Sequence, residues 1–513
     1  MLVKTFGSAV YGVEAIAITI EVNVSNGQNY VIVGLPDVAV KESLERIEAA
    51  IKTNGFDMPR TKLVVNMAPA DIKKTGSAFD LPIALGVLGA SEQLMNPDAL
   101  KDYVIMGELS LDGNIQSIRG ALPIAIQARK DGFKGLIIPK VNAREAGMVN
   151  NLKVYGVTHL KEVVEFLSDE TTLAPEDVNT REEFYNNQNI FDVDFNEVKG
   201  QENIKRALEI AAAGGHNAIL IGPPGAGKTM LAKRLPTILP PLSLQEALET
   251  TKIHSVAGKL PGDSALIARR PFRSPHHTIS DAALVGGGSN PQPGEISLAH
   301  NGVLFLDELP EFKRSALEVM RQPMEERKVT ISRAKVALDF PANFMLIASM
   351  NPCPCGYFNH PDKECTCPPG AVQKYLNKIS GPLLDRIDLH VEVTPVAFSE
   401  LSTTKPGEDS ATIRERVIKA RKIQTERYKD EPGVYANAQM SSKILREICQ
   451  IDKPGELLLK RAMEKLSLSA RAYDRILKVS RTIADLADSA DIKPEHLAEA
   501  IHYRSLDREG WGG

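Results

Sequence analysis

The stretch "NAILIGPPGAGKTMLAKRL", residues 217–235, constrains the fold of this chain more than any other segment. It contains the spacing G-x-x-x-x-G-K-[ST], with an apolar strand pattern before it and a helical pattern after it. Glycines in this spacing let consecutive backbone N–H groups turn around phosphate oxygens at the start of a helix. The motif therefore predicts a nucleotide-binding loop between a buried strand and a helix. The loop residues are Gly222, Pro223, Pro224, Gly225, Ala226, Gly227, Lys228 and Thr229.

Two further apolar strand patterns end in polar residues that fit such a site. "NGVLFLDELPEF" ends its apolar run at Asp307 and Glu308, and "NFMLIASMNP" ends its run at Asn351. Lys228 is expected to neutralise the β- and γ-phosphates of the nucleotide. Thr229 and Asp307 are expected to hold Mg²⁺, and Glu308 to activate water. The amide of Asn351 can orient the attacking water, and the alternative is a simple turn residue at the end of a strand.

A chain of 513 residues is too long for one hydrophobic core. Its changes of pattern predict an α/β domain over 1–168, an acidic linker over 169–198, an α/β core over 199–398 and a helical region over 399–513. Residues 1–24 alternate apolar and polar side chains like a strand and unlike a signal peptide. The longest apolar runs are about half the length of a membrane span. We therefore expect a cytoplasmic, multidomain α/β protein without membrane contact, whose net charge of −4 still permits a local nucleic-acid surface.

The order of the glycine-rich loop, "LFLDE", "MNP", "LLDRID" and "SARAYDRIL" resembles that of the AAA+ ATPases of the helix-2-insert clade. Within that clade the chain is similar to the ComM/YifB group, often described as magnesium-chelatase-like. The resemblance implies a P-loop AAA+ core of three αβα layers, a C-terminal helical lid, and ATP and Mg²⁺ as ligands.

The resemblance also implies roles for three single residues. Asn351 would be the sensor-1 residue, Arg386 the arginine finger donated to a neighbouring subunit, and Arg471 the sensor-2 arginine of the lid. A finger acting on a neighbour requires a ring, so the resemblance implies a homo-oligomer, most simply a hexamer. From the residues alone, either arginine could equally form a surface ion pair.

Two basic segments follow the glycine-rich loop. "RPFRSPHHT" belongs to an insert longer than a compact core requires, and "MEERKVTISRAKVALDF" alternates like a hairpin. In the clade that the chain resembles, both segments face the channel of the ring, where basic side chains would follow a nucleic-acid backbone. The alternatives are structural or metal-binding histidines and a solvated hairpin. The expected DNA contacts are Arg270, Arg273, His276, His277, Arg327, Lys328, Arg333 and Lys335.

The first domain resembles the Lon-protease fold in "TGSAFDLPIALGVL" and "IRGALPIAIQARKDG". Lon proteases need a serine nucleophile and a lysine base. The resemblance places Ala78 at the nucleophile position and Leu122 at the base position. Ser77 lies one residue away, where a rigid strand–helix junction would misdirect its hydroxyl. We expect a Lon-like domain without proteolytic chemistry that supports ring assembly or binds DNA.

Two functions of different classes fit this organisation. The resemblance implies an ATP-driven hexameric DNA motor, a helicase or branch-migration translocase acting on single-stranded or branched DNA. Its setting would be the homologous recombination of incoming DNA during natural transformation. The alternative is an AAA+ remodeller that does not act on DNA, such as a metal-chelatase motor subunit or a chaperone. The fused Lon-like domain favours the first.

Four of the five cysteines fall within "NPCPCGYFNHPDKECTCPPG", residues 351–370. Four thiolates in two pairs can form a closed tetrahedral Zn²⁺ site, which folds a loop that has no core of its own. The C-x-C pairs are tighter than the usual C-x2-C, so free thiols and redox disulfides remain alternatives. The candidate ligands are Cys353, Cys355, Cys365 and Cys367.

Overall fold

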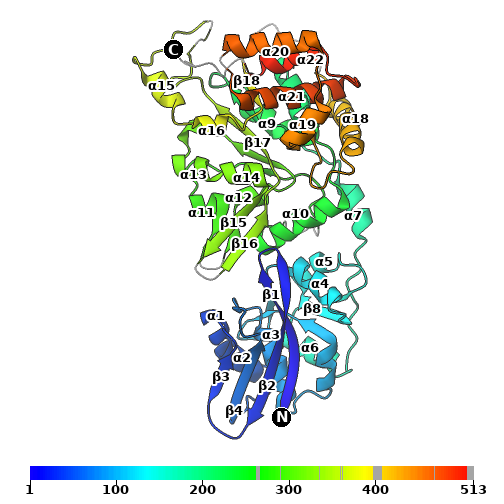
Figure 1. Ribbon diagram of the computed structural model, residues 1–513. Coiled ribbons are helices and arrows are strands. Elements are labelled where there is room, and N and C mark those ends of the chain that lie inside the picture. The colour runs from blue at the N-terminus through cyan, green and yellow to red at the C-terminus, as the bar shows by residue number, and fades with distance from the viewer. Residues whose placement is uncertain are drawn as a thin grey trace.

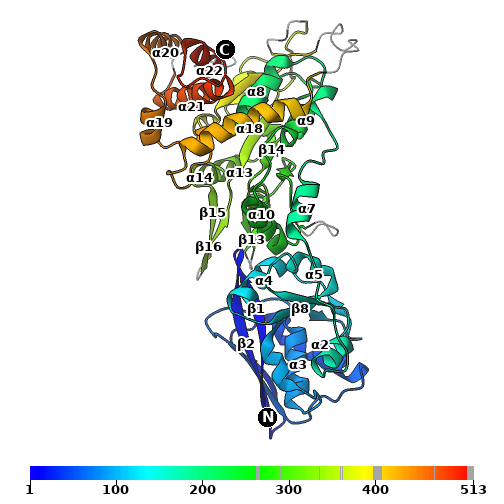
Figure 2. The same cartoon turned by 90° about the vertical axis from the view of Figure 1, so that its right-hand side faces the viewer.

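The computed structural model describes residues 1–260, 266–288, 291–333, 336–358, 360, 362–396, 407–466 and 468–504, with the side chains of Arg333 and Val336 outside this description. The molecule is elongated, and its N-terminal unit lies at the opposite end from the C-terminal helices (Figure 1). A second α/β unit lies between them, as the perpendicular view confirms (Figure 2). The α/β class expected from the sequence is therefore correct.

The N-terminal unit is built on a seven-stranded mixed sheet in the order β3-β4-β2-β1-β5-β8-β9. Buried and less buried side chains alternate along β4, as expected for strands that cover a core on one face. The strands are β1 (Leu2–Tyr11), β2 (Glu14–Ser25), β3 (Tyr30–Val33), β4 (Lys62–Ala68), β5 (Tyr103–Ile105), β8 (Gly135–Pro139) and β9 (Lys153–Val157), with the small pair β6 (Glu108–Leu109) and β7 (Ile115–Gln116) beside them. The helices are α1 (Val38–Lys41), α2 (Ser43–Thr53), α3 (Asp80–Ala90), α4 (Ala121–Lys130), α5 (Lys140–Ala146) and α6 (Leu160–Leu167).

The middle unit is built on a five-stranded sheet in the order β11-β14-β17-β10-β18, and all of its strand pairs are parallel. Parallel strands are buried on both faces, and β10, β14 and β17 are accordingly buried along their whole length. The strands are β10 (Ala218–Ile221), β11 (Phe272–Arg273), β14 (Val303–Leu306), β17 (Met345–Met350) and β18 (Leu389–Glu392).

Helices and two hairpins surround this sheet. The helices are α8 (Glu202–Gly214), α9 (Lys228–Arg234), α10 (Leu244–Ala257), α11 (Asp281–Val285), α12 (Glu295–Leu298), α13 (Arg314–Val319), α14 (Arg321–Glu326), α15 (Ala371–Leu376) and α16 (Gly381–Leu384). The hairpins are β12 (Gly286–Gly287) with β13 (Gln292–Pro293), and β15 (Lys328–Arg333) with β16 (Val336–Pro341). The alternation in "MEERKVTISRAKVALDF" thus predicts the second hairpin correctly.

The C-terminal region is helical in the part that the structure describes. Its helices are α18 (Ser410–Arg427), α19 (Ser442–Ile448), α20 (Lys453–Leu466), α21 (Ala470–Leu486) and α22 (Pro494–His502). Helices α18 and α21 both pack on α8, so the C-terminal helices share one hydrophobic core with the layer of the middle unit that contains α8. The expected boundary at residue 398 falls outside the described residues.

The N-terminal and middle units meet where α4 packs against α10. Leu242 and Ala247 of the middle unit belong to the hydrophobic core of the N-terminal unit. The backbone N–H of Gly120 donates to the Ser255 carbonyl at 3.1 Å. A shared core of this kind predicts that the two units move together more than a flexible linker would allow.

Part of the acidic linker is helical. Residues Thr180–Asn187 form a helix, α7, whose N-cap Asn179 accepts a hydrogen bond from the Glu182 backbone N–H. Phe184 is buried in the core of the N-terminal unit, and Arg144 pairs with Glu183. The burial of one aromatic side chain, which net charge does not reveal, keeps this segment on the first unit.

Candidate nucleotide-binding site

The predicted phosphate loop lies between β10 and α9, beyond the carboxyl end of a central strand. Gly225 and Gly227 have φ values of +79° and +84°, a left-handed backbone that side chains with a Cβ rarely adopt. A Cβ on Gly222 would lie 2.2 Å from the carbonyl oxygen of Val393, so only glycine fits where the chain leaves the sheet. The loop is completed by Pro223, Pro224 and Ala226.

Lys228 is the buried first residue of α9. Its Nζ donates to the carbonyl oxygens of Gly222 at 2.6 Å and Pro223 at 2.9 Å, and to Asn351 Oδ1 at 3.1 Å. These bonds engage all three donors of the ammonium group. Burial lowers the pKa of Lys228, although the neighbouring carboxylates oppose this shift. The structure thus brings the loop lysine and Asn351 together across two strands.

Thr229 and Asp307 also meet. The Thr229 hydroxyl donates to Asp307 Oδ2 at 2.6 Å, and the Ser349 hydroxyl donates to the other carboxylate oxygen. A hydroxyl and a carboxylate side by side offer the oxygen ligands that Mg²⁺ prefers, next to the loop that would hold phosphates. Ser349 was not identified from the sequence. It precedes Asn351 by two residues, and the period of a strand places both on the same face of the sheet.

Glu308 follows directly and points toward solvent, with its side chain 59% exposed. Its φ of +54° is unusual for a residue with a side chain, and such backbone strain clusters at functional sites. His277 Nδ1 lies 3.4 Å from Glu308 Oε2, and the ring of His276 lies 4.1 Å from that of His277. The predicted DNA-contact histidines therefore stand beside the candidate water-activating carboxylate.

A cavity of about 580 Å³ opens beside the phosphate loop. One wall is the loop itself, and another comes from the cysteine-rich segment that follows Asn351. Sequence reasoning did not identify this second wall, because motif spacing does not show which distant loop folds over a site. The lining residues include Gln201, Met230, Tyr357, His360 and Lys363.

The two candidate arginines outside the loop are both paired within the chain. Arg386 is 13% exposed, donates to the Pro382 carbonyl at 2.6 Å and pairs with Glu325 at 2.5 Å. Arg471 is 67% exposed and contacts Asp385 at 3.3 Å. The Arg471 side chain therefore touches the residue next to Arg386. Glu325 was not identified from the sequence, and nothing in its helical pattern marks it.

The expected DNA-contact residues have varied surroundings. Arg270 donates to the carbonyl oxygens of Pro240 and Asn301 and pairs with Glu246, and Arg273 pairs with Glu295.

The basic residues of the β15–β16 hairpin are likewise engaged where the structure describes them. Arg327 donates to the Gly433 carbonyl, and burial lowers the pKa of Arg327. Lys328 forms an exposed pair with Asp339 at 2.9 Å. Lys335 and the side chain of Arg333 lie outside the described residues.

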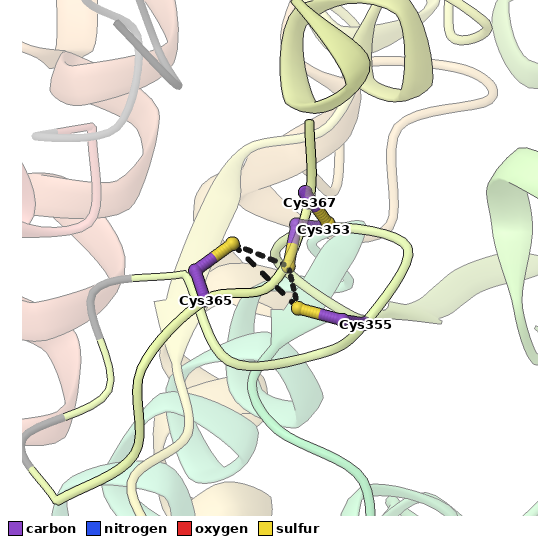
Figure 3. Close-up of side chains that lie close together, drawn as sticks. All are labelled: Cys353, Cys355, Cys365 and Cys367. Carbon is purple, nitrogen blue, oxygen red and sulfur yellow. Dashed lines mark hydrogen bonds between the residues drawn. The ribbon is translucent and has the colours of Figure 1, made fainter. Parts of the chain in front are cut away.

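The four clustered cysteines lie together on the loop after β17 (Figure 3). Their sulfur atoms all lie within 4.8 Å of one another, and none of the four forms a disulfide. Among the residues that the structure describes, this is the one group of three or more His, Cys, Asp or Glu side chains close enough to hold a metal ion.

The protease-like positions of the first unit lack a serine–lysine pair. Leu122 is fully buried in the hydrophobic core, and Ala78 packs against that core. The Ser77 hydroxyl donates to the Glu108 carboxylate, and Lys74 donates to the Pro69 carbonyl. The hydroxyl and the amine thus have different partners.

In this parallel sheet a phosphate loop follows the strand β10, and an acidic pair follows β14. Together these features define a class of protein. That class is the P-loop ATPases of the AAA+ type. The family model "Magnesium chelatase, subunit ChlI" matches residues 194–401. The models "Subunit ChlI of Mg-chelatase" and "Magnesium chelatase, subunit ChlI C-terminal" match residues 20–142 and 407–504.

Relatives extend this match to nearly the whole chain. Competence protein ComM of Haemophilus influenzae is 44% identical over 510 residues, which cover 99% of this chain and 98% of the relative. YifB of Escherichia coli is 44% identical over 505 residues, covering 98% and 96%. The chain belongs to the ComM/YifB family of magnesium-chelatase-like AAA+ ATPases.

A shorter similarity concerns the protease-like fold. Lon protease 2 of Bacillus subtilis is 32% identical over 154 residues, 27% of this chain and 26% of that protein. The chain thus combines an AAA+ unit with a Lon-like domain. In the described part of the chain, none of the helices has the length and apolar character needed to cross a membrane.

Proposed function

We propose that this protein is an ATP-driven, ring-forming DNA motor, a hexameric helicase or branch-migration translocase. Its role would be the homologous recombination of incoming DNA during natural transformation, in the cytoplasm. The ATP-driven part of the proposal is supported by one set of contacts. At the ends of three parallel strands, these contacts join Lys228 to Asn351 and Thr229 to Asp307. The DNA part is supported by the near full-length similarity to a competence protein.

The residues of the site fit a nucleotide with Mg²⁺. Lys228 has its donors on two loop carbonyls and one amide, which it can exchange for phosphate oxygens without leaving a buried charge unpaired. Thr229 and Asp307 would hold Mg²⁺, which neutralises charge on the phosphates. Glu308 is exposed beside them and would take the proton of the attacking water, while Asn351 orients that water.

Arg386 and Arg471 complete the proposed catalytic set. Arg386 would reach the γ-phosphate of a neighbouring subunit, which makes the ring necessary for turnover. Arg471, on the outer helical region, would contact the nucleotide of its own subunit. Both would exchange an ion pair within the chain for a contact with phosphate.

The contacts within the chain reduce the set of residues that we propose to contact DNA. Arg270, Arg273 and Arg327 are each held by partners inside the chain. Lys328 forms an exposed ion pair with Asp339, which phosphate can replace at small cost. We propose that Lys328, together with the sequence-predicted residues Arg333 and Lys335, contacts the DNA backbone in the ring channel.

One experiment tests the proposal directly. ATPase activity is measured with single-stranded, duplex and four-way junction DNA, and native mass is recorded at each step. We expect stimulation by DNA that falls steeply with salt, accompanied by hexamers. If none of the three DNA structures stimulates the ATPase activity at low salt, the proposal of a DNA motor is refuted.

The family models favour a second candidate, because they are named for a magnesium-chelatase subunit. In that case the same ATPase would remodel a partner protein. The DNA experiment separates the two: an active hexameric ATPase that is indifferent to DNA supports the remodeller.

A further inference from the structure

The segment between β17 and α15 lacks regular structure. Within residues 351–358, 360 and 362–370 there are turns and bends but no helix or strand. A loop of this length without secondary structure is uncommon in a compact domain unless something else holds it. Its partly buried side chains pack at the edge of a core, with Cys353 fully buried.

The sulfur positions match a tetrahedral metal site. Cys353 Sγ lies 3.3 Å from Cys355 Sγ and 3.8 Å from Cys365 Sγ, and the Cys355–Cys365 separation is 3.6 Å (Figure 3). Four sulfurs at about 2.3 Å from one zinc ion are separated by about 3.8 Å from each other. A disulfide needs a separation of about 2.05 Å, so these distances do not describe one.

The backbone also supports thiolate ligands. The N–H groups of Gly356 and Phe358 donate to Cys353 Sγ at 3.2 and 3.3 Å. Such donors orient a ligand and stabilise its negative charge. Four sulfurs leave no coordination position for substrate, so the site is structural.

The same loop touches the nucleotide site at three places. Asn351, two residues before Cys353, accepts a hydrogen bond from Lys228. Gly356, with φ of +87°, packs so closely on Pro224 that a Cβ would lie 2.5 Å from Cδ of that proline.

The third contact is the wall of the cavity itself. Tyr357 and Lys363 line it, with Lys363 Nζ 4.8 Å from the centre of the Tyr357 ring. These residues lie between the two cysteine pairs, so the pairs fix the ends of the segment that forms the wall.

We infer that the four cysteines bind one structural Zn²⁺, and that this zinc holds the loop against the phosphate loop, so that zinc and nucleotide binding stabilise each other. The coupling rests on the nucleotide site proposed above, whereas the metal site does not. By linkage, removing zinc weakens nucleotide binding, and bound nucleotide strengthens zinc binding by the same factor.

The metal site is tested on the full-length protein. Zinc is measured in the purified wild type, in Cys365→Ala and in the matched control Cys449→Ala, whose thiol is buried elsewhere. We expect one zinc per chain in the wild type and the control, and its loss in Cys365→Ala. Cobalt exchanged into the wild type should give the absorption of a tetrahedral thiolate complex. Less than half a zinc ion per wild-type chain would overturn the metal site. This outcome does not depend on whether Cys365→Ala folds.

The coupling is tested with a fluorescent ADP analogue. Affinity is compared between zinc-loaded, chelator-stripped and zinc-restored wild type, and we expect about tenfold weaker binding without zinc, recovered on restoration. Equal affinity in all three overturns the coupling. Lys228→Ala should lose the nucleotide and keep its zinc. A zinc-loaded wild type that binds no nucleotide refutes the nucleotide site and the coupling together, and leaves the metal site intact.

Discussion

The ion pair between Arg386 and Glu325 predicts a specific response to mutation. If Arg386 acts on the nucleotide of a neighbouring subunit, it must first leave Glu325, 2.5 Å away. Glu325 is 55% exposed, so we assign the pair about 1 kcal/mol, the upper end for an exposed ion pair. Removing that cost by Glu325→Gln raises the population of free Arg386 about fivefold. The protein concentration that gives half-maximal ATPase activity should fall by a similar factor.

The assay is ATPase rate against protein concentration at saturating ATP and low salt. Glu326→Gln is the matched control, because it removes the same charge one residue along the helix, from a side chain that accepts from Gln322. Arg386→Ala should be inactive at every concentration, and the effect of Glu325→Gln should shrink as salt rises. Superimposable curves for the two glutamine variants would falsify the reasoning.

Five other substitutions have defined outcomes. Lys228→Ala should abolish ATP binding, whereas Glu308→Gln should bind ATP and hydrolyse it at least about a hundredfold more slowly, as equilibrium binding and single-turnover rates will show. Arg270→Ala leaves two partly buried carbonyls without this donor and should cost about 1 kcal/mol of unfolding free energy in chemical denaturation. Lys328→Ala should leave the free energy of unfolding nearly unchanged yet lower the salt dependence of DNA binding by about one unit. Burial and the charge of a neighbouring arginine hold the pKa of His390 well below 6.5, so the unfolded chain binds a proton that the folded chain refuses. His390 should therefore contribute a fall in stability of about 1.4 kcal/mol per pH unit below about 6.5, and His390→Leu should reduce the slope by that amount in unfolding measured at pH 7 and 5.5.

The arrangement of the candidate nucleotide site could be predicted from the sequence because its parts are local. A phosphate loop requires glycine at fixed positions, and a buried strand reveals itself as an apolar run whose end is visible in the sequence. Lys228, Asp307 and Asn351 follow such patterns, and the structure brings all three together. Parallel strands make this possible, since their carboxyl ends meet at one edge of the sheet.

The partners of the basic residues could not be predicted in this way. An arginine in a polar segment has the same pattern whether it faces solvent or a carbonyl oxygen thirty residues away. Arg270 and Arg327 depend on the carbonyl groups of Asn301 and Gly433, whose positions are set by the packing of other elements. The helix in the acidic linker was not predicted for a similar reason. The burial of Phe184 stabilises it despite the acidic side chains around it, and composition does not reveal that burial.

The segment from Asn351 to Arg386 explains how the proposed chemistry could pass between subunits. At its start, Asn351 contacts the lysine of its own phosphate loop. The cysteine cluster follows within two residues and fixes the wall of the same cavity. At its end, Arg386 is held by Glu325 on α14 and is proposed to reach the next subunit. Because one covalent segment carries all three features, we propose that a change in nucleotide at one site would shift Arg386, the residue proposed to act on the neighbouring subunit. A flexible loop would absorb that shift, whereas a loop closed by a metal would transmit it. The position of the four cysteines between Asn351 and Arg386 is consistent with such a role.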